Sequence, residues 1–207
     1  MLQEKDKSED KMDVILFGGS FNPPHIGHRH VITTIRNQFP KSKLYICPNF
    51  VSPFKLNEKK FSKEEIWSLC LAEFEAFLEN NVILWDDEIK KDQISFTIDT
   101  LFKLKQLEPG HLISLVIGED NVTHFNQWKS YREILNLVYK LIIVRRETEF
   151  PKPVSIPNYI PAEKILVLNN PIMIKSSQEI RNLLENGLEI NSILPKTKTL
   201  LLNMYKQ

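Results

Sequence analysis

The chain has 207 residues, of which 42% are hydrophobic and 26% are charged. This composition is ordinary for a globular protein and excludes wholesale disorder. The length predicts one domain, which we place at 13–207, behind a solvated, charged tail at 1–12. The formal net charge of +1 argues against a nucleic-acid partner, but it leaves room for a local basic pocket that binds a phosphorylated small molecule.

Cysteine usage and the N-terminal residues indicate the compartment. Cys47 and Cys70 are the two cysteines, each in an apolar run, and the chain has no CxxC pair or Cys/His cluster at zinc spacing. We therefore expect buried free thiols and no metal held by the protein. Residues 1–12 carry both charge signs without the apolar core of a secretory signal. No apolar stretch reaches the ~18 residues of a membrane span, so we expect a cytoplasmic protein with no membrane partner.

Short apolar segments alternate with helical patterns along the chain. A helix that carries Val31, Ile32, Ile35 and Phe39 on one face follows the first apolar segment. This alternation predicts an α/β fold, namely a doubly wound, Rossmann-like parallel sheet with a short helical C-terminal part. We expect strands at 14–17, 44–47, 82–84, 112–117, 138–144 and 165–168, and further helices at 62–78, 97–107, 131–137, 177–186 and 197–205.

Local signals set several of these boundaries. Ser62 and Glu65 have the spacing of a capping box, and Thr97 is a residue type that caps helices. Two stretches are expected to be loops: 48–61, which is unusually long for a connection, and the proline-rich segment 147–163. The length of 48–61 favours a functional role, because loops that exceed the usual connection are more often functional than structural.

Ligands of doubly wound sheets lie beyond the carboxyl ends of the strands. The residues that directly follow the predicted strands are therefore site candidates on pattern alone. They are Gly18, Gly19, Ser20, Pro48, Asn49, Gly118, Glu119, Asp120, Arg145 and Arg146.

The most informative run is 18–28, GGSFNPPHIGH, which follows the first strand and opens the first helix. Its glycines allow the backbone to approach a ligand closely, and a helix N-terminus attracts phosphate. His25 and His28 are three residues apart and so share one face of the first helical turn. Two imidazoles there suit a phosphate whose charge rises during a reaction. The alternatives are two surface histidines near a helix cap, or a zinc pair whose third ligand is not evident.

This run resembles the GGxFxPxHxGH signature of the nucleotidylyltransferase superfamily. Further segments resemble the bacterial nicotinate-mononucleotide adenylyltransferases, in the same order along about 13–205. These segments are Pro48-Asn49 with Ser52 to Lys55 (the PN…PPHK loop), Ser95 to Leu101 (SYTxxTL), Ile117 to Trp128 (IGxD…W), Leu141 to Arg146 (a strand with a basic end), Ser176 to Arg181 (ISSTxIR) and Leu194-Pro195 (LP before the last helix).

The chain also departs from the family pattern at several positions. Lys175 and Gln178 stand at the Ile and Thr positions of ISSTxIR, and Phe54 stands where the loop usually has His. Ser20 and Asn22 replace Thr and Asp. Because the two serines and the arginine of the late motif are kept, we expect phosphate binding to survive these changes.

The resemblance implies that the chain transfers the adenylyl group of ATP to nicotinate mononucleotide, giving deamido-NAD and pyrophosphate. It implies that His25, His28 and Arg181 are the catalytic residues, although Arg181 could instead be an ordinary solvated helix charge. Mg²⁺ would arrive with ATP, held mainly by phosphate and water. The residues implied to bind ATP are Gly18, Gly19, Ser20, Phe21, Lys55, Gly118, Asp120 and Ser177. Two of them have another interpretation: Lys55 could be an ordinary loop lysine, and Asp120 could be a helix cap.

The nicotinate end decides which acceptor is used. Trp128 would stack on the electron-poor pyridine ring, with Phe125 as a wall, unless Trp128 is a plain core residue. Thr97 would receive the nicotinate carboxylate at a helix start, which favours the acid over the amide. Asn22, Asn49 and Phe96 complete the residues assigned to nicotinate mononucleotide.

Two other functions remain open on the sequence. A sister enzyme of the same fold would use nicotinamide mononucleotide or phosphopantetheine as acceptor. A binding or regulatory module would keep the nucleotide pocket without catalysis, and the KSSQEIR departure is the one feature that favours it. Self-association into a homo-oligomer is left open by the sequence.

Overall fold

The computed structural model describes residues 13–49, 61–79, 81–91, 94–145, 153–170 and 176–205. The predicted tail 1–12 and the site candidates Lys55 and Arg146 lie outside the described residues, as do Phe54 and Lys175.

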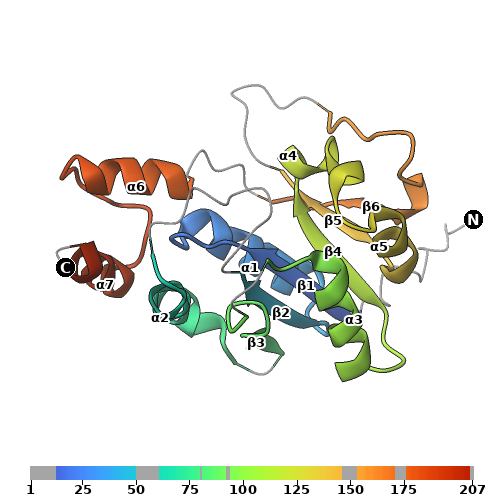
Figure 1. Ribbon diagram of the computed structural model, residues 1–207, viewed down its shortest axis with the longest axis horizontal. Coiled ribbons are helices and arrows are strands. Elements are labelled where there is room, and N and C mark those ends of the chain that lie inside the picture. Colours follow the sequence, from blue (N-terminus) through green and yellow to red (C-terminus); the bar gives the residue numbers. More distant parts are fainter. Residues whose placement is uncertain are drawn as a thin grey trace, which may run out of the picture.

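A six-stranded, all-parallel sheet in the order β3-β2-β1-β4-β5-β6 forms the centre of the molecule (Figure 1). This is the strand order of a doubly wound dinucleotide-binding sheet, so the predicted fold class is confirmed. The strands are β1 (Val14–Gly19), β2 (Lys43–Pro48), β3 (Val82–Leu84), β4 (Ile113–Gly118), β5 (Leu141–Val144) and β6 (Ile165–Val167).

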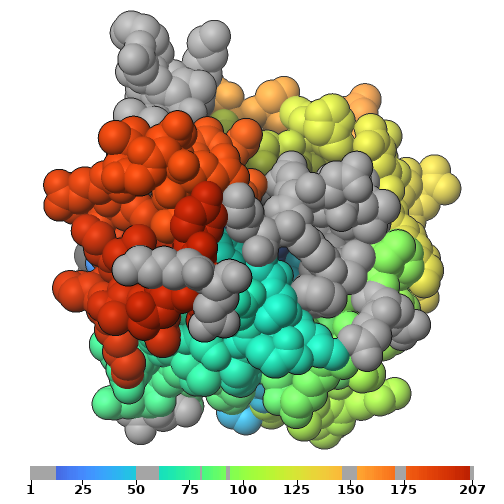
Figure 2. Space-filling model, turned by 60° about the vertical axis from the view of Figure 1, so that its left-hand side comes forward, coloured from blue at the N-terminus to red at the C-terminus, as the bar shows by residue number. Residues whose placement is uncertain are grey.

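Helices cover both faces of the sheet, because strands buried on both sides need apolar surface on each face. One core joins the sheet to α1 (Ile26–Gln38), α2 (Lys63–Phe74), α6 (Ser177–Glu185) and α7 (Pro195–Tyr205). The opposite core joins it to α3 (Thr97–Leu107) and α5 (Tyr131–Leu137), with the short α4 (Glu119–Val122) beside them. In Figure 2 the C-terminal residues, in orange and red, lie against α2, in teal.

Several predicted boundaries were wrong by a few residues. The helix predicted at 62–78 ends at Phe74 and continues as a 3-10 turn, and 138–140 do not belong to β5. Ser62 and Glu65 do form the predicted capping box of α2. The prediction that Thr97 caps α3 was wrong: Phe96 is the N-cap residue, in extended conformation and without a side-chain cap, and Thr97 is the first helical residue.

The sheet opens at its topological switch point, between β1 and β4. β1 pairs with β2 as far as Gly19↔Pro48, and β4 pairs with β5 as far as Gly118↔Val144. The β1–β4 pairing ends earlier, at Phe17↔Val116. The two glycine-bearing strand ends therefore separate at the place where doubly wound sheets bind their ligands.

No helix among the described residues is long and apolar enough to cross a membrane. Cys47 and Cys70 are free and buried, as predicted, and burial raises the pKa of both thiols.

Candidate active site

The two histidines of the glycine-rich run form the N-terminal cap of α1. His25 is the N-cap residue, and its Nδ1 accepts a hydrogen bond from the backbone N–H of Gly27 at 3.1 Å. His28 Nδ1 accepts one from the backbone N–H of His25 at 3.2 Å, which closes a reciprocal capping box. The imidazole centroids are 3.9 Å apart. The sequence therefore placed the pair correctly on one turn, and the structure adds that both rings hold the backbone.

These hydrogen bonds decide which nitrogen of each imidazole carries a proton. Because Nδ1 of both rings accepts from a backbone N–H, the neutral rings carry their proton on Nε2. The two Nε2–H groups are then hydrogen-bond donors, as a phosphate oxygen requires. The first turn of α1 contains no acidic residue, so nothing within that turn opposes the attraction of the helix N-terminus for an anion.

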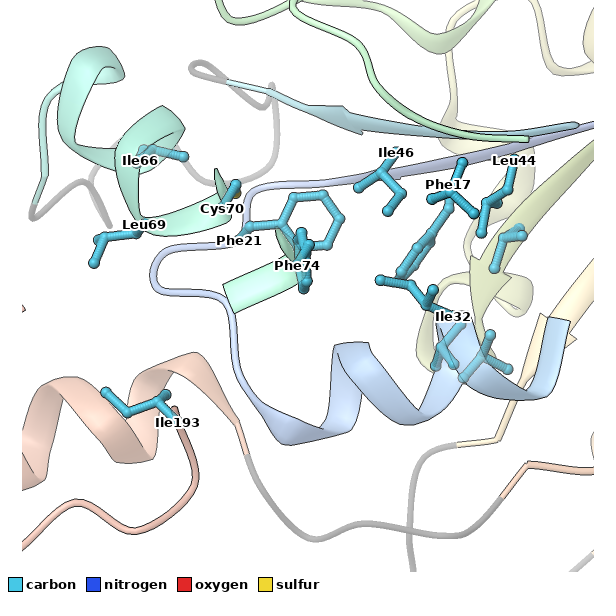
Figure 3. Packing of buried hydrophobic residues seen from close by; sticks show 14 of the residues in the cluster. Phe17, Phe21, Ile32, Leu44, Ile46, Ile66, Leu69, Cys70, Phe74 and Ile193 are labelled. Carbon is cyan, nitrogen blue, oxygen red and sulfur yellow. The ribbon is translucent and has the colours of Figure 1, made fainter. Parts of the chain in front are cut away.

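Phe21 packs against the first turn of α1, on the side of the hydrophobic core. Its ring packs edge-on against the rings of Phe17 at 5.4 Å and Phe74 at 5.5 Å between centroids (Figure 3). It also packs edge-on against the His28 ring at 4.8 Å, and Phe21 is 1% exposed. The Phe21 backbone has a φ of +40°, an unusual conformation for a residue with a side chain. This burial makes Phe21 a support for His28. A direct ATP contact by its side chain stays a prediction.

Gly19 is needed for the same packing. A Cβ at Gly19 would lie 3.0 Å from the nearest carbon of the Phe21 ring, whereas a Cβ at Gly18 would meet nothing closer than the Cys47 carbonyl oxygen at 3.9 Å. Gly18 is exposed and Ser20 is half-buried, and both follow the last residue of β1 that pairs with β4.

Helix α6 is attached directly to the glycine-rich run. The Ser177 hydroxyl donates to the Pro23 carbonyl oxygen at 2.8 Å, and an Arg181 guanidinium N–H donates to the Asn22 carbonyl oxygen at 2.7 Å. Ser176 caps the helix by accepting from the N–H of Glu179 at 3.1 Å. The structure thus brings Ser177 and Arg181 to the histidine turn across more than 150 residues of sequence, as the proposed phosphate site requires.

A second group of predicted residues gathers at the start of α3. Phe96 is half-buried, and the Lys129 ammonium lies 4.3 Å from the centroid of its ring. Trp128 is half-buried and packs on Phe125 at 5.2 Å between centroids, and Phe125 is fully buried. Of the Trp128–Phe125 pair, Trp128 is therefore the ring with surface left for a ligand, and Phe125 packs behind it.

Thr97 presents an anion-binding group in spite of the wrong capping prediction. As the first residue of α3, its backbone N–H has no acceptor within the helix. Asn49 also points to a polar site, since its side-chain oxygen is buried without a hydrogen-bond partner among the described residues. The Asn49 backbone N–H donates to the Gly19 carbonyl oxygen at 2.9 Å, which fixes the turn after β2 beside the turn after β1.

The ends of β4 and β5 meet in a small polar network. Gly118 is the N-cap residue of α4, and Asp120 lies exposed in the first turn of that helix. Glu119 lies 3.7 Å from the Arg145 guanidinium. The Asn170 side chain exchanges two hydrogen bonds, each 3.0 Å, with the Arg145 backbone and so fixes the end of β5.

Buried carboxyl groups are the residues that sequence reasoning missed. Glu73 is fully buried, lies 3.4 Å from the Arg29 guanidinium and accepts from the Leu194 N–H at 2.9 Å, so it ties α2 to α1 and to the start of α7. Glu88 is buried and accepts from the Thr100 hydroxyl at 2.5 Å, behind the start of α3. Burial raises the pKa of both carboxyls. In sequence both look like ordinary charged positions.

Metal ligands do not gather in the part of the chain that the structure describes. There, no group of three or more His, Cys, Asp and Glu side chains stands close enough to hold an ion. The zinc alternative for His25 and His28 gains no third ligand within those residues.

The fold and this arrangement define a nucleotide-binding α/β protein of the kind that transfers nucleotidyl groups. The model of the cytidylyltransferase-like family matches residues 16–183. A probable nicotinate-nucleotide adenylyltransferase of Leptospira borgpetersenii is 35% identical over 80% of this chain and 82% of its own length. A second, from Fusobacterium nucleatum, is 32% identical over 89% of this chain and 94% of its own. The chain therefore belongs to the cytidylyltransferase-like family and, within it, to the nicotinate-nucleotide adenylyltransferases.

A solved structure has the same fold. The nicotinic acid mononucleotide adenylyltransferase of Plasmodium falciparum, determined in complex with NaAD, superposes with a TM-score of 0.74 at 20% identity, covering 94% of this chain and 97% of that one.

Proposed function

We propose that this chain transfers the adenylyl group of ATP to nicotinate mononucleotide, giving deamido-NAD and pyrophosphate in NAD biosynthesis. The observation that carries the proposal is the shared name of relatives that are 32–35% identical over most of both chains. The sheet opening between β1 and β4, with the histidine turn at its rim, supports it independently.

In the proposed reaction, an oxygen of the mononucleotide phosphate attacks the α-phosphorus of ATP. One P–O bond forms there, and the bond from the α-phosphorus to the bridging oxygen breaks as pyrophosphate leaves. Such a transfer needs positioning and charge neutralisation, with no covalent nucleophile from the protein. The Nε2–H groups of His25 and His28 are suited to donate to the α-phosphate as its charge rises.

Ser177 and Arg181 would hold the β- and γ-phosphates. Both side chains lie at the turn that precedes α1, where they donate to the carbonyl oxygens of Pro23 and Asn22. To bind phosphate, Ser177 would exchange its one O–H bond to Pro23 for a bond to a phosphate oxygen, whereas the Arg181 guanidinium has five N–H donors. The planar guanidinium of Arg181 suits a bidentate phosphate contact. The ATP would enter as its Mg²⁺ complex, with the ion held by phosphate and water.

The acceptor would lie across the sheet opening, at the start of α3. Trp128 would stack on the pyridine ring, and the N–H of Thr97 would receive its carboxylate. The side-chain oxygen of Asn49, which has no hydrogen-bond partner among the described residues, would add a polar contact from the turn after β2. We also propose that 13–207 fold as one domain and act in the cytoplasm; a homo-oligomer stays a prediction.

The experiment mixes the protein and MgATP with nicotinate mononucleotide, nicotinamide mononucleotide or phosphopantetheine in turn, and measures released pyrophosphate. The proposal expects release with nicotinate mononucleotide at a rate at least tenfold above that with either alternative. Faster release with another acceptor would move the chain to a sister activity. Binding of ATP without pyrophosphate release from any acceptor would favour the non-catalytic module.

A further inference from the structure

One lysine lies against the start of α3, where the proposed nicotinate site receives the carboxylate. The Lys129 ammonium lies 4.3 Å from the centroid of the Phe96 ring and 3.5 Å from Asp99 Oδ2. Phe96 is the N-cap residue of α3, and Asp99 lies in the first turn of that helix. Lys129 itself directly follows Trp128. Its side chain thus connects the segment that carries the stacking ring to the helix start that would receive the carboxylate.

We propose that Lys129 is a specificity-determining residue that favours the acid over the amide form of the acceptor. This inference rests on the proposed function. A carboxylate at the start of α3 lies next to the ammonium of Lys129 and is attracted by it, whereas a neutral amide gains nothing from the charge. The N–H groups at the helix start discriminate by hydrogen bonding, and Lys129 adds a charge-dependent part to the same preference.

Asp99 works against Lys129. Its carboxylate is the acidic group of the first turn of α3, and it repels the nicotinate carboxylate that Lys129 attracts. The pair is open to solvent, since the Lys129 and Asp99 side chains are 49% and 53% exposed. Water and salt therefore screen both effects, and the net contribution of Lys129 should be severalfold rather than orders of magnitude.

The same exposure separates this role from a structural one. Exposed ion pairs contribute little to folding stability, and methionine keeps an unbranched apolar stem that can cover the Phe96 ring. We therefore expect Lys129→Met to change Tm by no more than about 2 °C. Its effect should fall on the ratio of kcat/KM for the two mononucleotides.

Lys140 supplies a matched control. Its ammonium also lies over an aromatic ring, 5.4 Å from the Tyr139 centroid, and it donates to the Glu163 carbonyl oxygen at 2.6 Å. It directly precedes β5, at the amino-terminal end of that strand, whereas the proposed site lies beyond the carboxyl ends of the strands. Lys140→Met removes the same charge from the protein without touching the start of α3, so the acid-to-amide ratio should stay at the wild-type value.

The experiment measures kcat/KM with nicotinate mononucleotide and with nicotinamide mononucleotide for the wild type and three variants. We expect Lys129→Met to lower the acid-to-amide ratio about fivefold and Asp99→Asn to raise it about twofold. Adding salt should lower the ratio in the wild type but barely in Lys129→Met.

Failure of the inference about Lys129 and failure of the proposed function give different results. If the wild type turns over nicotinate mononucleotide and Lys129→Met keeps the wild-type ratio, the inference about Lys129 is overturned and the proposed function stands. An equal loss of ratio in Lys140→Met would also overturn it, because net charge would then be the cause. If the wild type shows no turnover with nicotinate mononucleotide, the proposed function itself fails.

Discussion

Gly19→Ala tests whether the packing beneath the histidine turn governs catalysis. The added Cβ would lie 3.0, 3.2 and 3.3 Å from three carbons of the Phe21 ring, where ordinary carbon contacts are about 3.5–4.0 Å. The ring has little room to withdraw, because the rings of Phe17, His28 and Phe74 pack around it. Overpacking of this kind costs about 1–3 kcal/mol. For a chain of this size, that lowers Tm by roughly 2–12 °C.

We also expect Gly19→Ala to lower turnover strongly, because the Phe21 ring packs directly against the His28 ring. Displacement of a reacting group by about 1 Å can cost on the order of a hundredfold in rate, so we expect more than a tenfold loss of turnover in the protein that remains folded. Gly18→Ala is the matched control for stability, because its Cβ meets nothing closer than 3.9 Å. Its Tm should stay within about 2 °C of the wild type.

The assay is thermal unfolding together with pyrophosphate release at a temperature where all variants are folded. A double-mutant cycle with Phe21→Leu isolates the contact. In the Phe21→Leu background, Gly19→Ala should cost less stability than it does alone, because the smaller side chain leaves space. Equal Tm losses for Gly18→Ala and Gly19→Ala, or a cost of Gly19→Ala that Phe21→Leu does not reduce, would refute the steric argument.

Three further predictions concern single side chains. His28→Gln keeps an acceptor at the third helical position for the His25 N–H but removes the imidazole, so turnover should fall more than tenfold at unchanged Tm; wild-type turnover would remove the catalytic role. Arg181→Ala should raise the KM for ATP more than that for nicotinate mononucleotide, and Arg181→Lys should recover part of it; equal changes in both KM values would contradict a triphosphate role. Burial raises the pKa of Glu88 above its usual value of 4.5, so its protonated form stabilises the fold below that value and this stability is lost as pH rises through the folded pKa. Glu88→Gln, which still accepts from Thr100, should therefore raise Tm at pH 8 and not at pH 4; a gain that is the same at both pH values would contradict this assignment.

The strands and the first turn could be predicted from sequence because their signals are local. Val14 to Phe17 is a continuous apolar run that ends in two glycines, and the structure extends the strand through both glycines to Gly19. The capping box at Ser62 was equally local and was confirmed. The short α4 and the 3-10 turn Phe125–Gln127 were missed, because elements of three or four residues leave too little periodicity to detect.

The contacts that assemble the site could not be predicted, because they join distant parts of the chain. Nothing near Ser177 or Arg181 in sequence indicates that their partners are carbonyl oxygens of the turn before α1. Glu73 is predicted to be solvated because of its charge, but Arg29 of α1 and the backbone of Leu194, directly before α7, lie against its carboxyl group. The prediction that Thr97 caps α3 was wrong for a different reason. Threonine is a common N-cap residue, but the extended backbone at Phe96 makes Phe96 the N-cap, so the helix begins one residue earlier than predicted.

Acceptor choice in a single vessel tests the central claim most directly. The protein is incubated with ATP labelled at the α-phosphorus and with equal, limiting concentrations of nicotinate mononucleotide, nicotinamide mononucleotide and phosphopantetheine. The labelled products are then separated. We predict that the label enters deamido-NAD at least tenfold faster than any other product. Label that enters chiefly NAD or dephospho-coenzyme A, or that stays in ATP, would contradict the account.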